Sequence, residues 1–280
     1  MTSALNKYNN LTQRVIAGLV GVFIIIAAVG YSDWAYFVVF FLLCMATQLE
    51  FYKLTGLDGM VPLKWYGTVS GLLIFTISFL EEKDILGYQY YFLVFPIVFG
   101  IFLIKLYKKS DSNPFVNIGI TFLGIIYVAI PFSLLNVSAF SLGHYSYEIV
   151  LGLLLMLWAS DTGAYFAGTY FGRRKLFERI SPKKTWEGFI GGLFLAIAMA
   201  YGLSLYFHDL NPYQWIMAGV IMTVCGTYGD LVESLFKRSM SIKDSGTAIP
   251  GHGGFLDRFD GLLLSIPFII TFLEIFWLEK

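Results

Sequence analysis

The segment 149-IVLGLLLMLWASDTGAYFAG-168 decides the fold class, because about 20 mostly apolar residues are what a helix needs to cross a bilayer. Other apolar segments lie near residues 15–31, 34–49, 65–80, 90–105, 115–136, 188–207, 213–229 and 261–278. Of the 280 residues, 57% are apolar and 14% are charged, and the mean hydropathy is +0.70. Soluble domains carry about 25% charged residues, so the composition argues against a water-soluble protein.

Helices are the expected form of all nine segments, since a backbone in lipid must satisfy its own hydrogen bonds. The alternating pattern of a membrane β-barrel is absent from the sequence. We therefore expect an all-α, polytopic membrane protein with about nine transmembrane helices. Residues 1–280 are expected to form a single membrane domain, in which 1–148 supply the N-terminal spans and 149–280 the catalytic spans with their cytoplasmic loops.

Lysine and arginine give an independent test of this topology, because cytoplasmic loops hold most of these residues. With nine spans and a cytoplasmic N-terminus, 17 of the 19 lysines and arginines lie on the cytoplasmic side of the membrane. The other two, Lys83 and Lys280, lie on the opposite side. A miscounted span in the middle of the chain would destroy this bias. The two long basic stretches between residues 158 and 260 then face the cytoplasm.

The richer stretch is 229-GDLVESLFKRSMSIKDSGTAIPGHGGFLDRFD-260. Asp230 stands at the end of one apolar segment, and Asp257 and Asp260 stand at the start of the next. Two acidic helix ends separated by a basic loop could face one another, which suits Mg²⁺, a cation that takes a few carboxylate oxygens and completes its shell with water and phosphates. The competing interpretation is solvation of helix ends, with Glu233 and Lys237 as an ordinary i, i+4 pair. We favour that interpretation for Glu233 and metal ligation for Asp230 and Asp257, because charges at membrane level are usually functional.

Glycines 251, 253 and 254 surround His252, and such a loop can bring backbone N–H groups close to an anion. Glycine clusters are more often plain turns, but this one lies between Lys243 and Asp257. His252 could donate to a phosphate or cap a turn, and the sequence leaves both open.

The second stretch begins at Ser160, Asp161 and Thr162, which interrupt an apolar segment. Asp161 could bond hydroxyls of a neighbouring helix, although we favour a functional role. Further on, Ser181 and Pro182 have the form of an N-cap and first helical residue. This pattern predicts Lys183, Lys184 and Thr185 in a first helical turn, where an anion would bind. The arginines at 173, 174 and 179 could instead set topology or attract anionic lipid.

Carboxylates for metal, with basic groups and a glycine-rich loop for phosphates, indicate phosphoryl or nucleotidyl transfer. No P-loop, Rossmann glycine pattern or HExxH motif occurs in the sequence. A site at the membrane face suggests that one substrate is a lipid.

The runs S-L-F-K-R (234–238), K-D-S-G (243–246) and P-G-H-G-G-F-L-D-R-F-D (250–260) closely resemble the signature of phosphatidate cytidylyltransferases, also called CDP-diacylglycerol synthases. S-D-T-G-A-Y at 160–165 and S-P-K-K-T-W-E-G at 181–188 also resemble that family. The resemblance covers about residues 158–260, and the number of spans is compatible with it.

This resemblance implies that CTP and phosphatidic acid react to give CDP-diacylglycerol and pyrophosphate. It also implies Mg²⁺ with a second cation, K⁺, a homodimer, and a multi-pass location in the cytoplasmic membrane with the active site facing the cytoplasm. Membrane lipids are expected partners and nucleic acid is not. The metal positions it matches are Asp230 and Asp257. Basic side chains would neutralise phosphates, and Asp161 would lie near the metals.

The candidate catalytic residues are Asp161, Lys237, Arg238, Lys243, Asp244, His252 and Arg258. The candidate substrate-binding residues are Ser181, Lys183, Lys184, Thr185, Ser234, Gly251, Gly253 and Gly254.

Two other functions compete with this one. A related CTP-dependent transferase acting on another lipid phosphate, or a polyprenol kinase, would need much the same groups. A transporter would also have many spans and intramembrane acids such as Asp161 and Glu274, but it has no evident need for a Gly-His-Gly-Gly turn between lysines and aspartates.

Overall fold

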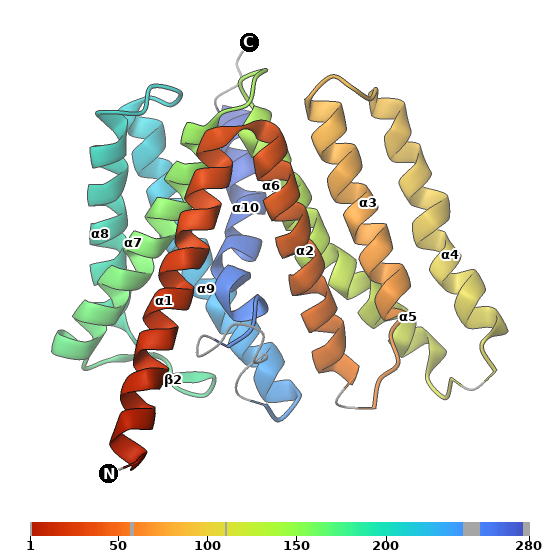
Figure 1. Cartoon of the computed structure of the whole chain (residues 1–280), viewed down its shortest axis with the longest axis horizontal. Helices are drawn as coiled ribbons and strands as arrows, with labels where there is room; N and C mark the ends of the chain where they lie inside the picture. The colour runs from red at the N-terminus through yellow and green to blue at the C-terminus, as the bar shows by residue number, and fades with distance from the viewer. Residues whose placement is uncertain (1, 57–58, 110, 243–252, 277–280) are drawn as a thin grey trace.

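The computed structural model describes residues 2–56, 59–109, 111–242 and 253–276, with side chains for Thr12 and, within those ranges, from Val15 to Ile275. Helices make up nearly all of it (Figure 1). Their bounds are α1 (Thr2–Tyr31), α2 (Asp33–Thr55), α3 (Lys64–Glu82), α4 (Val94–Tyr107), α5 (Pro114–Gly124), α6 (Ile130–Phe140), α7 (Tyr147–Phe171), α8 (Trp186–Ser204), α9 (Pro212–Ser239) and α10 (Leu256–Phe276). A 3₁₀ turn (Tyr88–Leu93) leads into α4, and a π-helical turn (Ile125–Ala129) joins α5 to α6.

Every expected apolar segment coincides with one of these helices, with α5 and α6 sharing the segment 115–136. Six helical stretches among the described residues are long and apolar enough to cross a membrane. They are Asp33–Thr55, Tyr88–Tyr107, Pro114–Phe140, Tyr147–Phe171, Trp186–Ser204 and Pro212–Ser239. The chain is therefore an all-α integral membrane protein, as its composition predicts.

The connections alternate between the two ends of the bundle. In Figure 1, the start of α1, the connection from α7 to α8 and the start of α5 lie at the lower end, whereas the α1–α2 turn and the end of α10 lie at the upper end. Basic residues predicted to be cytoplasmic, such as Lys105, Arg173 and Lys184, belong to the lower connections or the helix ends beside them. One end of the molecule is thus far more basic than the other.

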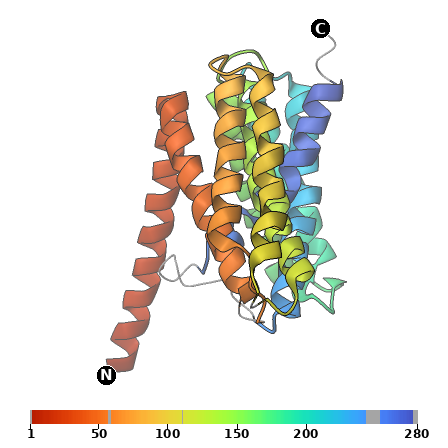
Figure 2. The same ribbon diagram turned by 90° about the vertical axis from the view of Figure 1, so that its right-hand side faces the viewer.

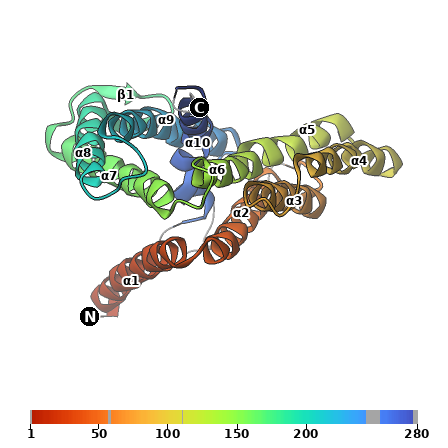
Figure 3. The same ribbon diagram turned by 90° about the horizontal axis from the view of Figure 1, so that it is seen from above.

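Helix α6 lies between two groups of helices. Seen from above, α7, α8, α9 and α10 gather on one side of it and α3, α4 and α5 extend on the other, while α1 diverges from the bundle (Figure 3). Figure 2 shows the same divergence from the side, with α1 joined to the rest at its upper end through α2. The main contacts of α1 are with α2 and α7.

Aromatic side chains fill the core on the α2, α3 and α6 side, where Tyr36, Phe40, Phe75 and Phe132 are all buried. A buried amide among them has partners: Asn136 accepts a hydrogen bond from Tyr36 Oη at 2.9 Å and donates to Phe75 O at 3.0 Å. A buried polar network of this kind costs little because its members have partners.

The predicted helix start at Ser181 is wrong. Residues Ser181–Thr185 form strand β2, which pairs antiparallel with β1 (Lys175–Phe177), and α8 begins at Trp186. Thr185 is the N-cap, because its hydroxyl accepts the N–H of Gly188 at 3.1 Å. The carboxylate of Glu187, in the first turn of α8, accepts hydrogen bonds from the N–H groups of Arg173 and Arg174 and so holds the hairpin against the helix. Lys183 and Lys184 are therefore on an extended strand and not in a helical turn.

A buried ion pair joins α4 to its neighbours at the basic end. Lys105 bonds to Asp111 and to Val61 O at 2.5 Å, and the two charged side chains are 0% and 1% exposed. Asp111 also accepts from Asn117 Nδ2 at 2.6 Å. The bond from Lys105 holds the pKa of Asp111 below its usual value. This ion pair stabilises the connection between α4 and α5.

Candidate active site

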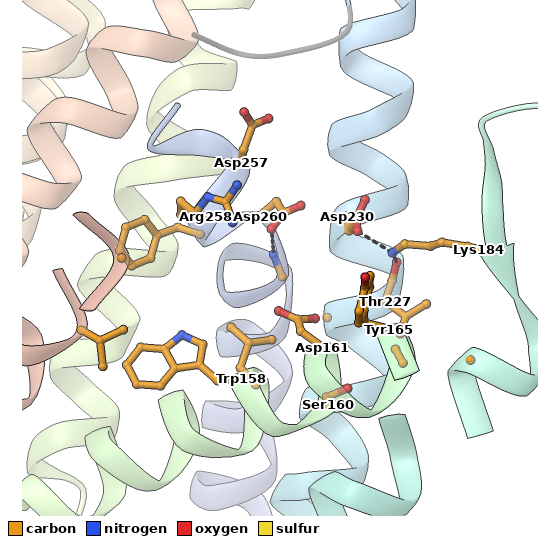
Figure 4. A pocket seen from close by; sticks show the side chains of 18 of the residues that line it. Trp158, Ser160, Asp161, Tyr165, Lys184, Thr227, Asp230, Asp257, Arg258 and Asp260 are labelled. Atoms are coloured by element: carbon orange, nitrogen blue, oxygen red, sulfur yellow. Dashed lines mark hydrogen bonds and ion pairs between the residues drawn. The ribbon is translucent and has the colours of Figure 1, made fainter. Parts of the chain in front are cut away.

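A pocket of about 900 Å³ lies where the lower halves of α7, α9 and α10 meet. Its polar wall carries Asp161, Lys184, Asp230, Arg258 and Asp260 (Figure 4). Its apolar wall comes from α1 and α2 and includes Ala17, Gly18, Gly21, Val22, Val39 and Leu43. The pocket therefore has one charged side and one side suited to hydrocarbon.

Close packing of α9 on α10 brings two of the carboxylates together. A Cβ on Gly229 would lie 2.5 Å from the carbonyl oxygen of Asp260, a distance that no side chain tolerates. Small residues allow membrane helices to approach in this way. Because Gly229 precedes Asp230, the close approach places the side chains of Asp230 and Asp260 on the same pocket. The predicted facing of two acidic helix ends is confirmed.

Strand β2 brings lysine to the pocket. Lys184 Nζ lies 2.7 Å from Asp230 Oδ2 and donates to Thr227 O at 3.2 Å, as Figure 4 shows. Ser234 Oγ donates to the other oxygen of Asp230 at 3.2 Å. Lys183 and Thr185 also line the pocket. The hairpin thus does bring lysine to the site, although its backbone is not the predicted helix.

Three carboxylates from three helices surround one space: Asp161 of α7, Asp230 of α9 and Asp260 of α10 (Figure 4). Asp161 and Asp230 repel each other electrostatically, and Asp260 is repelled by both. Lys184 and Arg258 offset this repulsion at Asp161. Such a concentration of negative charge at membrane level favours a cation or a polyanion carried with cations.

Asp257 lies at the edge of the same pocket and has its own partners. Lys237 Nζ is 2.8 Å from Asp257 Oδ1 and 2.5 Å from Glu233 Oε2. The predicted i, i+4 pair between Glu233 and Lys237 is confirmed. The interpretation of Glu233 as a solvated helix end is wrong, because its side chain is only 1% exposed. Burial follows from its place on the α9 face that packs on α10.

Two glycines close around Asp257. The N–H of Gly254 donates to Asp257 Oδ2 at 3.1 Å. Gly253 has φ +83°, and a Cβ there would lie 2.6 Å from the same oxygen. In this structure the glycine turn therefore holds the chain's own carboxylate, while its predicted contact with a phosphate stays a prediction.

The remaining predicted residues divide into three groups. Arg258 lines the pocket, whereas Ser181 and the exposed Arg238 lie outside its lining. Ser234 and Lys237 act on the site through Asp230 and Asp257. Four further predicted residues, Lys243, Asp244, Gly251 and His252, lie outside the described residues.

Sequence reasoning passed over two acidic residues, one that lines the pocket and one that bonds to the backbone beside it. Asp260 was noted only for its spacing from Asp257, yet it shares the pocket with Asp161 and Asp230. Glu50 of α2 accepts hydrogen bonds from the backbone at the start of α10. The signal that could have found Glu50 is its charge at the edge of an apolar segment.

The donor chemistry of the pocket fits Mg²⁺ in part. No three Asp, Glu, His or Cys side chains in the described ranges approach closely enough to hold a metal by themselves. Mg²⁺ uses one or two carboxylates and completes its shell with water and substrate phosphates. Carboxylate oxygens from α9 and α10 at one pocket meet that requirement when a nucleotide supplies the other ligands.

Comparison with known proteins gives the same assignment as the sequence motifs. The model of the cytidylyltransferase family matches residues 12–276. The chain is a member of the cytidylyltransferase family.

Among its relatives, the phosphatidate cytidylyltransferase of Bacillus subtilis is 32% identical over 278 residues, which is 95% of this chain and 99% of that protein. Proteins of the same name from Staphylococcus aureus and Haemophilus influenzae are 41% and 39% identical, over 60% and 62% of this chain. Those two alignments each span 64% of the relative's length. The family resemblance expected from the motifs at 160–165, 181–188 and 234–260 is confirmed.

Proposed function

We propose that this member of the cytidylyltransferase family is a CTP:phosphatidate cytidylyltransferase, which forms CDP-diacylglycerol and pyrophosphate. The observation that carries the proposal is a single pocket with carboxylates and lysine on one wall and hydrocarbon on the other. Near full-length similarity to a protein named phosphatidate cytidylyltransferase supports the same substrates.

In the proposed reaction, a phosphate oxygen of phosphatidic acid attacks the α-phosphorus of CTP. A new P–O bond forms, the bond between the α-phosphorus and the bridging oxygen breaks, and pyrophosphate leaves with that oxygen. The attacking phosphate is already ionised, so a strong general base is unnecessary. Lys184 and Arg258, which line the pocket, would neutralise phosphate charge in the transition state.

Mg²⁺, with K⁺ as a second cation, is part of the proposal. When bound, the cations would neutralise the triphosphate and orient its α-phosphorus. The residues proposed to hold them are Asp230 and Asp257, with Asp260 as a third carboxylate at the same pocket. Lys184 would exchange its present contact with Asp230 for one with phosphate.

The apolar wall is the proposed position of the acyl chains. Residues of α1 such as Gly18 and Gly21 have no bulky side chain and face the same pocket as Asp161. A phosphatidic acid lying along this wall would present its phosphate to the charged side. The proposal explains why a phosphate-handling site lies beside a helix that diverges from the bundle (Figure 2).

The finer topology is proposed from charge. Nine spans with a cytoplasmic N-terminus place the basic connections and the pocket on the cytoplasmic side of the cell membrane. The homodimer implied by the family resemblance is also a proposal, which chemical crosslinking in native membranes would test.

The test of function is pyrophosphate release by purified protein in mixed micelles of detergent and phosphatidic acid. Release that requires CTP, phosphatidic acid and Mg²⁺, and that stops with EDTA, supports the proposal. Equal release with another lipid phosphate would shift the assignment to a related transferase. Absence of release under every lipid condition would favour a transporter.

A further inference from the structure

The cytoplasmic end of α2 holds the start of α10 through a carboxylate that is far away in sequence. Glu50 Oε2 accepts the N–H of Phe255 at 2.8 Å, and Glu50 Oε1 accepts the N–H of Leu256 at 3.2 Å. Phe255 immediately precedes α10 and Leu256 is its first residue, and the N–H groups at a helix start have no partner within the helix. The carboxylate of Glu50 therefore caps α10 from another helix.

Burial strengthens this contact. Glu50 is 8% exposed and Leu256 is fully buried. A negative charge at a helix N-terminus is also favoured by the helix dipole. Removal of the carboxylate would leave one buried and one part-buried donor without that acceptor, which costs more than the loss of an exposed bond.

A second contact fixes α2 against α9. The ring of Phe51 stacks on the ring of Phe236 with centroids 5.1 Å apart and planes 15° apart. Phe236 precedes Lys237, the residue that bonds to Asp257. The end of α2 thus contacts α9 and the start of α10, two of the three helices that carry the carboxylates of the pocket.

Glu50 itself lies outside the pocket lining, whereas the residues it holds lie on or next to it. Phe255, Asp257 and Arg258 all line the pocket. The N–H of Arg258 donates to Phe255 O at 3.0 Å, so the position of the first turn of α10 depends on the position of residue 255.

We propose that Glu50 is a positioning residue, which sets the first turn of α10 so that Asp257 and Arg258 face the substrates. This inference rests on the proposed cytidylyltransferase activity for its kinetic consequence. Its structural consequence, protection of two backbone N–H groups, can be measured without turnover.

The test compares Glu50→Ala, which removes charge and acceptor, with Glu50→Gln, which keeps one acceptor oxygen. Misplacement of reacting groups by about 1 Å costs roughly 100-fold in rate, so kcat of Glu50→Ala should fall by about that factor, with a much smaller change in the KM for CTP. Glu50→Gln should recover part of the loss and lie within about tenfold of wild type, because neutral hydrogen bonds are weaker than charged ones. Hydrogen exchange at Phe255 and Leu256 should accelerate in both variants.

The matched control is Asp111→Asn. Asp111 is a buried carboxylate at the same end of the molecule, and it lies outside the pocket lining. This variant should lose thermal stability in detergent while it keeps wild-type kcat and wild-type exchange at residues 255 and 256.

Two outcomes would overturn the inference: wild-type kcat in folded Glu50→Ala, or unchanged exchange at Phe255 and Leu256. If Glu50→Ala does not fold, Glu50→Gln decides by the same two criteria. A wild-type protein without CTP-dependent turnover would refute the proposed function instead, and the exchange data would still decide whether Glu50 caps α10.

Discussion

A substitution at Gly253 tests whether the glycine turn exists to hold Asp257. Gly253 has φ +83°, and Gly143 at the other end of the bundle has φ +76°. A Cβ at Gly143 would meet nothing within 4 Å, whereas a Cβ at Gly253 would lie 2.6 Å from Asp257 Oδ2. The two alanine variants therefore share the backbone strain and differ in the collision with Asp257.

The expected magnitudes follow from these contacts. Left-handed backbone costs an alanine about 1–2 kcal/mol, which is the whole effect expected for Gly143→Ala. In Gly253→Ala the carboxylate must also move, which weakens its bonds to Lys237 at 2.8 Å and Gly254 N at 3.1 Å. Loss of a charge-assisted bond costs about 1.5–3 kcal/mol, so this variant should lose about 2.5–5 kcal/mol in all.

Activity should separate the two variants more sharply than stability. Each would be purified in detergent and measured by thermal unfolding and by pyrophosphate release below its unfolding temperature. We expect wild-type kcat in Gly143→Ala and a loss of about 100-fold in Gly253→Ala, because Asp257 is displaced. Equal kcat in the two variants would refute the argument that the turn serves Asp257.

Asp230→Asn and Asp257→Asn should each abolish turnover while thermal unfolding in detergent shows a folded protein; near-normal turnover would remove the residue concerned from the proposed metal site. Glu233→Gln should cost far less in kcat than either, since Glu233 lies outside the pocket lining, and complete loss would show that its charge is needed for turnover. Asp111→Asn should lower stability by about 3–5 kcal/mol at neutral pH, as for other broken buried pairs. The pKa of Asp111 is lower in the folded state than in the unfolded state. Its contribution to the free energy of unfolding is therefore fully present above the unfolded pKa of about 3.9 and is lost as pH falls through the folded pKa. The difference in unfolding temperature between wild type and Asp111→Asn should close in acid and stay constant near neutrality.

The helices were predictable because apolar length is a local property. Each of the segments from 15–31 to 261–278 can be recognised as a span without reference to any other segment, and within the described residues each lies largely in helix. The family signature was also readable from the sequence, since each of its motifs is a short run and all of them lie between about residues 158 and 260. The approach of the two acidic helix ends, with Asp230 on one and Asp257 and Asp260 on the other, followed from connectivity alone, because they stand at the same end of consecutive spans.

The start of α8 was not predictable by the same reasoning, because two N-cap patterns compete there. Ser181 with Pro182 and Thr185 with Glu187 both suit a helix start. The choice depends on the pairing of residues 181–185 with 175–177, which uses Ser181 in a strand. Local propensity does not report that pairing.

Contacts between distant segments account for the rest. Lys184 contacts Asp230 because the β1–β2 hairpin folds back toward α9. Glu50 contacts the start of α10 although the two are 205 residues apart in sequence. The charge of Glu50 at the edge of an apolar segment marks it as unusual, but nothing local in the sequence points to the backbone of residues 255 and 256 as what it binds. Asp260 had the signal of an acid at membrane level but was set aside for Asp257, although the pocket uses both.

The cap on α10 joins two parts of the chain that are synthesised at different times. Glu50 and Phe255 are 205 residues apart, which at about 5–20 residues per second corresponds to roughly 10–40 s of translation. Glu50 enters the membrane first, and the N–H groups that it accepts are made only with the final helix that the structure describes. A ribosome that stops before α10 leaves Asp161 and Asp230 in the membrane without Asp257 and Asp260. The proposed metal site is therefore complete only once α10 has docked, and we expect a chain that stops before α10 to have no turnover of CTP.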